Sequence, residues 1–315
     1  MTAGRSHLLG ALAIVVSSIL WGTTGTAATF APEVGAMAIG AAAMGIGGLL
    51  QALIAAPSVF GNRSRLRSQW RFLALGAATV AVYPLTFYAS MRMAGVTIGT
   101  VISIGSAPLF AALIERRVDG SSLSRRWLAG AGLGLVGMAL IGAARTSGHA
   151  MPGAAAPTLG VALGLFAGLT YATYSWSARK LMQRGVPSLA AMGAIFGGGG
   201  LLLMPVLAAT GAPFLWSWNN ALVGIYMAAV PMFLGYVCFG YGLARVQASM
   251  ATTITLLEPV VAAALAVIVV GERLPAMGWI GVALVVACLI FITIPGPAAK
   301  PAAIAAEPFP ETAGE

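Results

Sequence analysis

The chain has 315 residues, of which 59% are hydrophobic and only 8% charged, and its net charge is +9. Since a soluble domain carries roughly 25% charged residues, this composition excludes a soluble cytosolic enzyme, a disulfide-stapled secreted domain and a disordered protein. It predicts an all-α polytopic membrane protein, because a helix of about 20 apolar residues crosses the hydrocarbon core. The basic residues stand between apolar runs, so they indicate membrane topology and not nucleic-acid binding.

Ten apolar runs follow one another along the chain, separated by charged or Gly/Pro-rich segments. Those of the first half cover residues 8–32, 34–62, 72–91, 93–114 and 127–144. Those of the second half cover residues 158–178, two runs between 185 and 244, 246–271 and 274–295. We therefore expect a first five-helix repeat over residues 1–145, a linker loop over 146–157, a second repeat over 158–295, and a disordered cytoplasmic tail over 296–315.

The positions of Arg and Lys predict the orientation of the chain. With ten spans and a cytoplasmic N-terminus, 14 of the 17 basic residues fall on the inner side. Only Arg92, Arg145 and Arg273 fall on the outer side. Nine or eleven spans would lose this asymmetry, so the distribution also supports ten spans. We expect both termini on the cytoplasmic side of a bacterial inner membrane.

The two halves of the sequence resemble each other at an offset of 150 to 153 residues. Ala107-Pro108 matches Glu258-Pro259, and Trp127 matches Trp279 in the same order. Because five spans is an odd number, the second half is expected to enter the membrane upside down relative to the first. Inverted repeats are typical of secondary transporters, in which the substrate lies near the bilayer midplane between the halves.

A family resemblance rests on Trp21-Gly22 in the first span, a proline in the middle of the fourth and ninth spans, and Gly271-Glu272-Arg273-Leu274 before Trp279. With these motifs, residues 8–295 resemble the EamA-domain proteins of the drug/metabolite transporter superfamily, and within them the aromatic and neutral amino acid exporters of the YddG type. The resemblance implies ten helices, a central cavity and export of small metabolites. The first half departs from the pattern, since Ala107 stands where Glu258 stands in the second half.

Glu258 is the only acidic residue within a predicted span. A carboxylate inside the membrane is energetically costly, so a function is expected, either in proton coupling or as the partner of a substrate ammonium group. The alternative is structural: a protonated side chain would cap the backbone carbonyl that Pro259, lacking an N–H, leaves unpaired. Pro108 and Pro259 are candidate hinges, and fixed kinks are the alternative.

Deep aromatic and hydroxyl side chains are the other candidates for a substrate site, because such a cavity suits apolar, aromatic or cationic substrates. Helix packing and backbone bonding are the alternatives for each of them. Trp176, Trp216 and Trp279 lie near span ends and are expected at the membrane interface. The candidate substrate-binding residues are Trp21, Thr24, Tyr83, Phe87, Tyr88, Ser103, Ser106, Tyr171, Tyr174, Phe233, Tyr236 and Glu258.

These features predict a secondary exporter of small metabolites, above all neutral or aromatic amino acids, working by alternating access. Multidrug or other metabolite efflux is the alternative within transport, and an intramembrane enzyme is the alternative outside it. No G-x-x-x-x-G-K-[ST] motif occurs, which excludes ATP-driven transport by this chain alone. We expect no cofactor, no metal and no nucleic-acid partner, while the exact substrate, proton coupling, direction of transport and oligomeric state stay open.

Overall fold

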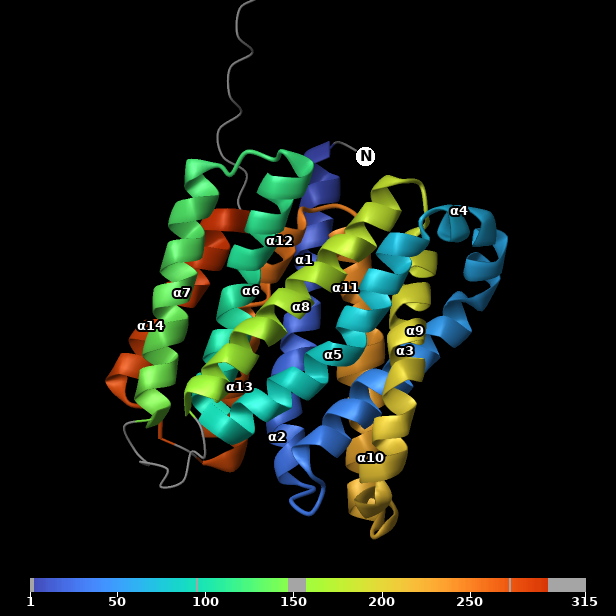
Figure 1. Cartoon of the computed structure of the whole chain (residues 1–315). Helices are drawn as coiled ribbons and strands as arrows, with labels where there is room; N and C mark the ends of the chain where they lie inside the picture. The colour runs from blue at the N-terminus through green and yellow to red at the C-terminus, as the bar shows by residue number, and fades with distance from the viewer. Residues whose placement is uncertain (1–2, 95, 147–156, 272, 294–315) are drawn as a thin grey trace, which may run out of the picture.

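The computed structural model describes residues 3–94, 96–146, 157–271 and 273–293, and every regular element in these ranges is helical (Figure 1). The helices of the first half are α1 (Ala3–Gly22), α2 (Thr24–Thr29), α3 (Ala36–Gly61), α4 (Arg63–Ser68), α5 (Trp70–Ala94), α6 (Val96–Asp119) and α7 (Arg125–Thr146). The predicted tail over 296–315 lies outside the described residues, as does most of the predicted linker over 146–157.

The second half contains two long helices, α8 (Pro157–Gln183) and α9 (Ser188–Thr210), and two spans that are divided into shorter helical pieces. Its other elements are η1 (Ala212–Leu215), α10 (Trp218–Met227), η2 (Ala228–Leu234), α11 (Gly235–Leu243), α12 (Ala248–Ile254), α13 (Leu257–Leu265), η3 (Ala266–Val270) and α14 (Ala276–Thr293). In the described part of the chain, glycines with positive φ follow three helices: Gly120 follows α6, Gly185 follows α8 and Gly271 follows η3. Only glycine adopts this backbone conformation without strain, so these positions end the helices.

Eight helical segments of the described chain have the length and apolar composition to cross a membrane. They cover Arg5–Thr29, Ala36–Gly61, Trp70–Ala94, Ile98–Asp119, Arg125–Ala144, Ser188–Thr210, Trp218–Leu243 and Ala248–Val269. The other two predicted spans correspond to α8, with 27 residues, and to α14, whose apolar part Ala276–Ile292 is shorter. The membrane crossing of α8 and α14 stays a prediction.

The first helices of the two halves, α1 and α8, run in opposite directions. In Figure 1, α1 starts at the top and runs downward, whereas α8 starts at the bottom and runs upward. The described part of α14 ends near the top, at the end of the bundle where α1 begins, which we call the N-terminal end. The basic helix α4 lies at the same end.

The packing of the helices is nearly symmetric between the halves. The second long helix of each half, α3 or α9, packs along the other, and so do the last helices of the halves, α7 and α14. The contact of α5 with α8 has its counterpart in the contact of α1 with α11. Small residues allow these close approaches: a Cβ added at Gly137 of α7 would lie 2.7 Å from the carbonyl oxygen of Gly281 in α14.

Candidate functional site

A pocket lies where several helices are interrupted. The first span breaks at Thr23, between α1 and α2, and the ninth breaks at residues 255–256, between α12 and α13. Between α10 and α11, the segment η2 has the wider turns of a π-helix and contains Pro231. Breaks of this kind within membrane spans are tolerated where the backbone lines a cavity or is buried in protein.

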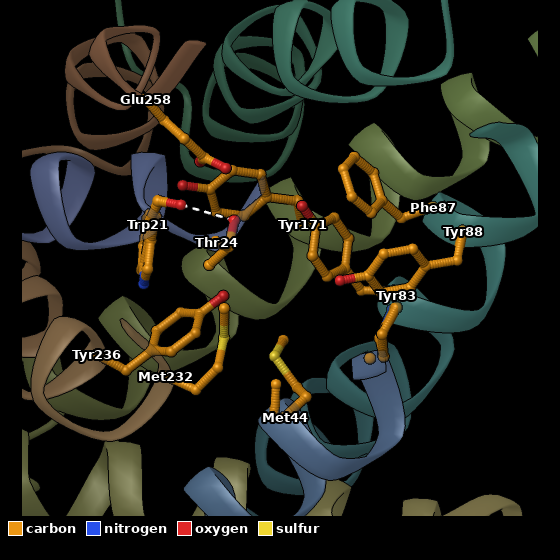
Figure 2. A pocket seen from close by; sticks show the side chains of 13 residues that line it. Trp21, Thr24, Met44, Tyr83, Phe87, Tyr88, Tyr171, Met232, Tyr236 and Glu258 are labelled. Carbon is orange, nitrogen blue, oxygen red and sulfur yellow. Dashed lines mark hydrogen bonds between the residues drawn. The ribbon is translucent and has the colours of Figure 1, made fainter. Parts of the chain in front are cut away.

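Thirteen residues from both halves line this pocket (Figure 2). They are Trp21, Thr24, Gly40, Ala43, Met44, Tyr83, Pro84, Phe87, Tyr88, Tyr171, Met232, Tyr236 and Glu258. The volume of the pocket is about 50 Å³, and one water molecule needs roughly 10–15 Å³ on this scale. The pocket therefore accommodates a few waters, and a substrate of amino-acid size requires the lining side chains or helices to move apart.

The pocket brings together eight of the twelve candidate residues, namely Trp21, Thr24, Tyr83, Phe87, Tyr88, Tyr171, Tyr236 and Glu258. Sequence reasoning missed Gly40, Ala43, Met44, Pro84 and Met232. Ala43, Met44 and Met232 are ordinary residues of apolar helices and carry no distinguishing signal in the sequence, whereas Pro84, a proline inside α5, carries the same signal as Pro108 and Pro259. Gly40 lies against the ring of Tyr88, and a Cβ there would overlap the ring.

The other four candidate residues do not line the pocket. Ser103 and Ser106 are buried where α6 packs on Gly168 of α8. Tyr174 is 1% exposed and shares a hydrogen bond of 2.7 Å between its hydroxyl oxygen and that of Tyr236. Phe233 faces a separate groove formed by α3, α9, η2 and α11.

Glu258 is the acidic residue of the pocket. It lies in the first turn of α13, is partly exposed, and points into the pocket toward the ring of Tyr171 (Figure 2). Within the described part of the chain its carboxyl group has no hydrogen bond and no ion pair. In a regular helix the N–H of residue 259 would bond to the carbonyl oxygen of Thr255, but proline has no N–H. This carbonyl oxygen instead accepts the backbone N–H of Glu258 at 3.0 Å. The geometry thus gives no support to the capping interpretation.

Trp21 connects the two halves beside the pocket. Its indole Nε1 donates to the carbonyl oxygen of Pro231 at 2.9 Å, and its ring centroid lies 4.6 Å from that of Tyr236. The widened turns of η2 lie against α1 where the indole reaches this carbonyl. Trp21 is 4% exposed, so it is held by protein on nearly all sides.

A buried aromatic cluster continues from the pocket toward the N-terminal end. It consists of Trp21, Tyr171, Tyr174, Phe196, Tyr236 and Phe239, all of them at most 4% exposed. The chain direction gives its depth: Tyr174 follows Tyr171 on α8, and Phe239 follows Tyr236 on α11, in both cases toward the N-terminal end. The half-buried Tyr83, Phe87 and Tyr88 line the pocket itself. The cluster therefore separates the pocket from the N-terminal end.

Charged groups close the N-terminal end above this cluster. The guanidinium of Arg179 donates to the backbone carbonyls of Leu243 and Val246, at the end of α11. The carboxylate of Glu115 accepts the backbone N–H of Ala248, at 2.7 Å, and that of Ser249, at the start of α12. These bonds satisfy unpaired helix-end groups and complement the helix dipoles.

One ion pair joins the two halves at the same end. Lys180 of α8 lies 2.7 Å from the carboxylate of Asp119 in α6, which also accepts the indole N–H of Trp176 at 3.0 Å. Trp176 is 7% exposed and packs on Phe72, so it is buried in protein, whereas Trp216 and Trp279 are 66% and 49% exposed. The expectation of an interfacial position is wrong for Trp176, because its indole N–H is used inside the protein.

The two candidate hinge prolines have different surroundings. Pro259 is buried in the first turn of α13, directly after the break at 255–256. Pro108 is buried inside α6, which is a single helix from Val96 to Asp119. The break beside Pro259 thus has no counterpart beside Pro108.

Comparison with known proteins identifies the family. The profile of the EamA-like transporter family matches residues 8–143 and again residues 158–294. The chain belongs to this family. The two matches show that the EamA-family fold occurs here as two repeats, and the protein is a membrane transporter.

Relatives of this EamA-family chain include three bacterial proteins. The uncharacterized transporter YwfM of Bacillus subtilis (strain 168) is 29% identical over 283 residues, which are 90% of this chain and 93% of YwfM. A protein of Streptantibioticus cattleyicolor named "Probable terminal-alkyne amino-acid exporter" is 25% identical, over 88% of this chain and 94% of that protein. The uncharacterized inner membrane transporter YicL of Salmonella typhimurium is 26% identical, over 90% and 95%.

The fold of the EamA-family chain also has a match among solved structures. One protein chain of known crystal structure superposes with a TM-score of 0.73, covering 90% of this chain and 95% of that chain. The sequence identity is 19%, so the match concerns the fold alone.

Proposed function

We propose that this EamA-family transporter exports small metabolites, foremost neutral or aromatic amino acids, by alternating access between two inverted repeats. The repeats comprise residues 1–145 and 158–295, each with five spans. The observation that carries the proposal is the pocket itself, which takes its walls from α1, α2, α3 and α5 of one half and from α8, η2, α11 and α13 of the other. A pocket between repeats, beside interrupted helices, is the arrangement that alternating access requires.

The covering of the pocket at its N-terminal end supports a two-state mechanism. Toward the N-terminal end the pocket is covered by the aromatic cluster and by the Asp119–Lys180 ion pair. The opposite state would open this end and close the other, with Pro259 and the break at 255–256 as one pivot. The name of the S. cattleyicolor relative supports an amino acid as the substrate. Multidrug efflux is favoured instead by the aromatic walls around a lone carboxyl group.

The pocket residues are expected to matter more for transport than the tryptophans of the outer surface. Trp21→Ala or Tyr83→Ala removes a wall of the pocket, whereas Trp216→Ala and Trp279→Ala remove side chains that are 66% and 49% exposed. Export of labelled phenylalanine from liposomes containing the purified variants measures the difference. We expect roughly a tenfold or greater loss for the first pair, as aromatic contacts in binding sites commonly cost, and little loss for the second. Equal losses in both pairs, at equal protein amounts, would contradict the site.

Both termini are expected in the cytoplasm of a bacterium, with the chain in its inner membrane. The 14-to-3 distribution of basic residues supports this orientation, and α1 begins at the same end of the bundle at which α14 ends. A fluorescent protein fused to the C-terminus should fluoresce, and an alkaline phosphatase fusion at the same point should be inactive. Active phosphatase would reverse the orientation.

A further inference from the structure

We propose, on the basis of the transport function above, that the pocket recognises the protonated amino group of an amphipathic amine. The carboxylate of Glu258 is its counter-charge, and the aromatic rings hold the apolar body. A carboxylate on the substrate, as in an amino acid, is tolerated but is not needed for binding. The site therefore takes primary amines as well as amino acids.

The first step concerns charge. Glu258 points into the pocket without an ion pair or a hydrogen bond in the described part of the chain. None of the thirteen lining residues is Lys, Arg or His. An unpaired carboxylate in a largely apolar site is costly, and the cost is removed when the group takes up a proton or receives a cation. Because no lining residue is cationic, a positive charge that pairs with the Glu258 carboxylate in this pocket comes from the ligand.

The second step concerns the walls. Tyr83 lies between Phe87 and Tyr171, with both ring-centroid distances at 5.6 Å. The ring of Trp21 stands at 78° to that of Tyr171, with the centroids 6.5 Å apart. Aromatic faces attract ammonium groups through their quadrupole and also bury apolar surface. Met44 and Met232 complete the walls with flexible thioether chains that adapt to different ligand shapes.

The third step concerns the group that a substrate carboxylate would meet. The hydroxyls of Tyr83 and Tyr88 have no hydrogen bond in the described chain, whereas the hydroxyl of Thr24 already donates to the carbonyl oxygen of Trp21 at 2.7 Å. Two neutral phenols offer a carboxylate less than a fixed guanidinium does. A ligand with a carboxylate and no amine also meets Glu258 as a like charge. The amine is thus the required group.

Binding to the purified full-length protein in detergent tests the proposal without transport. Isothermal titration calorimetry at pH 7 compares phenethylamine and isopentylamine with phenylalanine and with 3-phenylpropionate. We expect at least one amine to bind as tightly as phenylalanine or more tightly, and 3-phenylpropionate not to bind. Glu258→Gln should weaken amine binding roughly 10- to 100-fold, the usual effect of losing a charged partner.

Glu33→Gln is the matched control, because Glu33 is exposed, lies outside the pocket, and has its carboxylate contact with Asn220 preserved by glutamine. Its amine affinity should equal that of the wild type. Three results would each overturn the proposal. Both amines could fail to bind, 3-phenylpropionate could bind as tightly as the amines, or Glu258→Gln could leave the amine affinity unchanged. If Glu258→Gln does not fold, the comparison of the four ligands on the wild-type protein still tests the proposal. Binding of the amines together with no export of phenylalanine from liposomes would contradict the export function and leave this proposal standing.

Discussion

Glu258→Gln is expected to separate transport from the pH gradient while substrate exchange continues. Glutamine keeps the size and hydrogen-bonding capacity of the side chain but cannot titrate. The other titratable groups that line the pocket with Glu258 are the phenols of Tyr83, Tyr88, Tyr171 and Tyr236. If one proton enters for each substrate that leaves, a gradient of one pH unit supplies about 1.4 kcal/mol, which shifts the steady-state substrate ratio about tenfold.

The steady-state distribution of labelled phenylalanine across liposomes, at imposed gradients of zero, one and two pH units, measures this coupling. The wild type should respond to acid on the proton-entry side, and Glu258→Gln should give the same ratio at every gradient. Counterflow at equal pH on both sides, with phenylalanine raised about 100-fold to offset the weaker amine binding expected of this variant, shows that it still exchanges substrate. Glu258→Ala tests the capping interpretation. If Glu258 caps a backbone carbonyl, Glu258→Gln should still transport with its response to pH intact, whereas Glu258→Ala should lose transport. An intact response to pH in Glu258→Gln would contradict a role in coupling.

Gly137→Val is expected to destroy the packing of the two halves at α7 and α14. A Cβ at Gly137 would lie 2.7 Å from the carbonyl oxygen of Gly281, and one at Gly281 would lie 2.6 Å from the carbonyl oxygen of Gly137. The contact is between backbones, so no side chain can turn aside to relieve it. Overpacking of this kind costs about 1–3 kcal/mol or more, and we expect most of the protein to be lost to aggregation.

Gly132→Val is a control in the same helix. A Cβ at Gly132 meets no atom within 4 Å, and Gly132 is exposed on the surface of α7. Both substitutions change helix propensity equally, so their difference reports packing alone. Fluorescence-detected size-exclusion chromatography before and after heating measures the folded fraction of each variant. Equal melting of both variants would show that α7 and α14 are not packed at this point.

The sequence alone determined that this is a helical membrane protein with two related halves. In the bilayer, backbone groups cannot bond to water, so long apolar runs form helices. Polar or aromatic residues stand out in such runs, and for this reason Trp21, Tyr83 and Glu258 were found as candidates for the pocket that they line. A carboxyl group in an apolar span can be identified from the sequence as a functional candidate, because its burial in the membrane is energetically costly.

Only the tertiary structure decided which side of each helix faces the pocket. Lipid and protein interior are both apolar, so an apolar residue carries no sign of the face on which it lies. Met44 and Met232 were missed for this reason, and Ser103 was placed in the site although it packs against α8. The wide turns of η2 also depend on a neighbour, since the indole of Trp21 bonds to the carbonyl of Pro231 from a helix 210 residues away in sequence. Such partners exist only once the chain has folded, because the groups that satisfy a broken helix come from other helices.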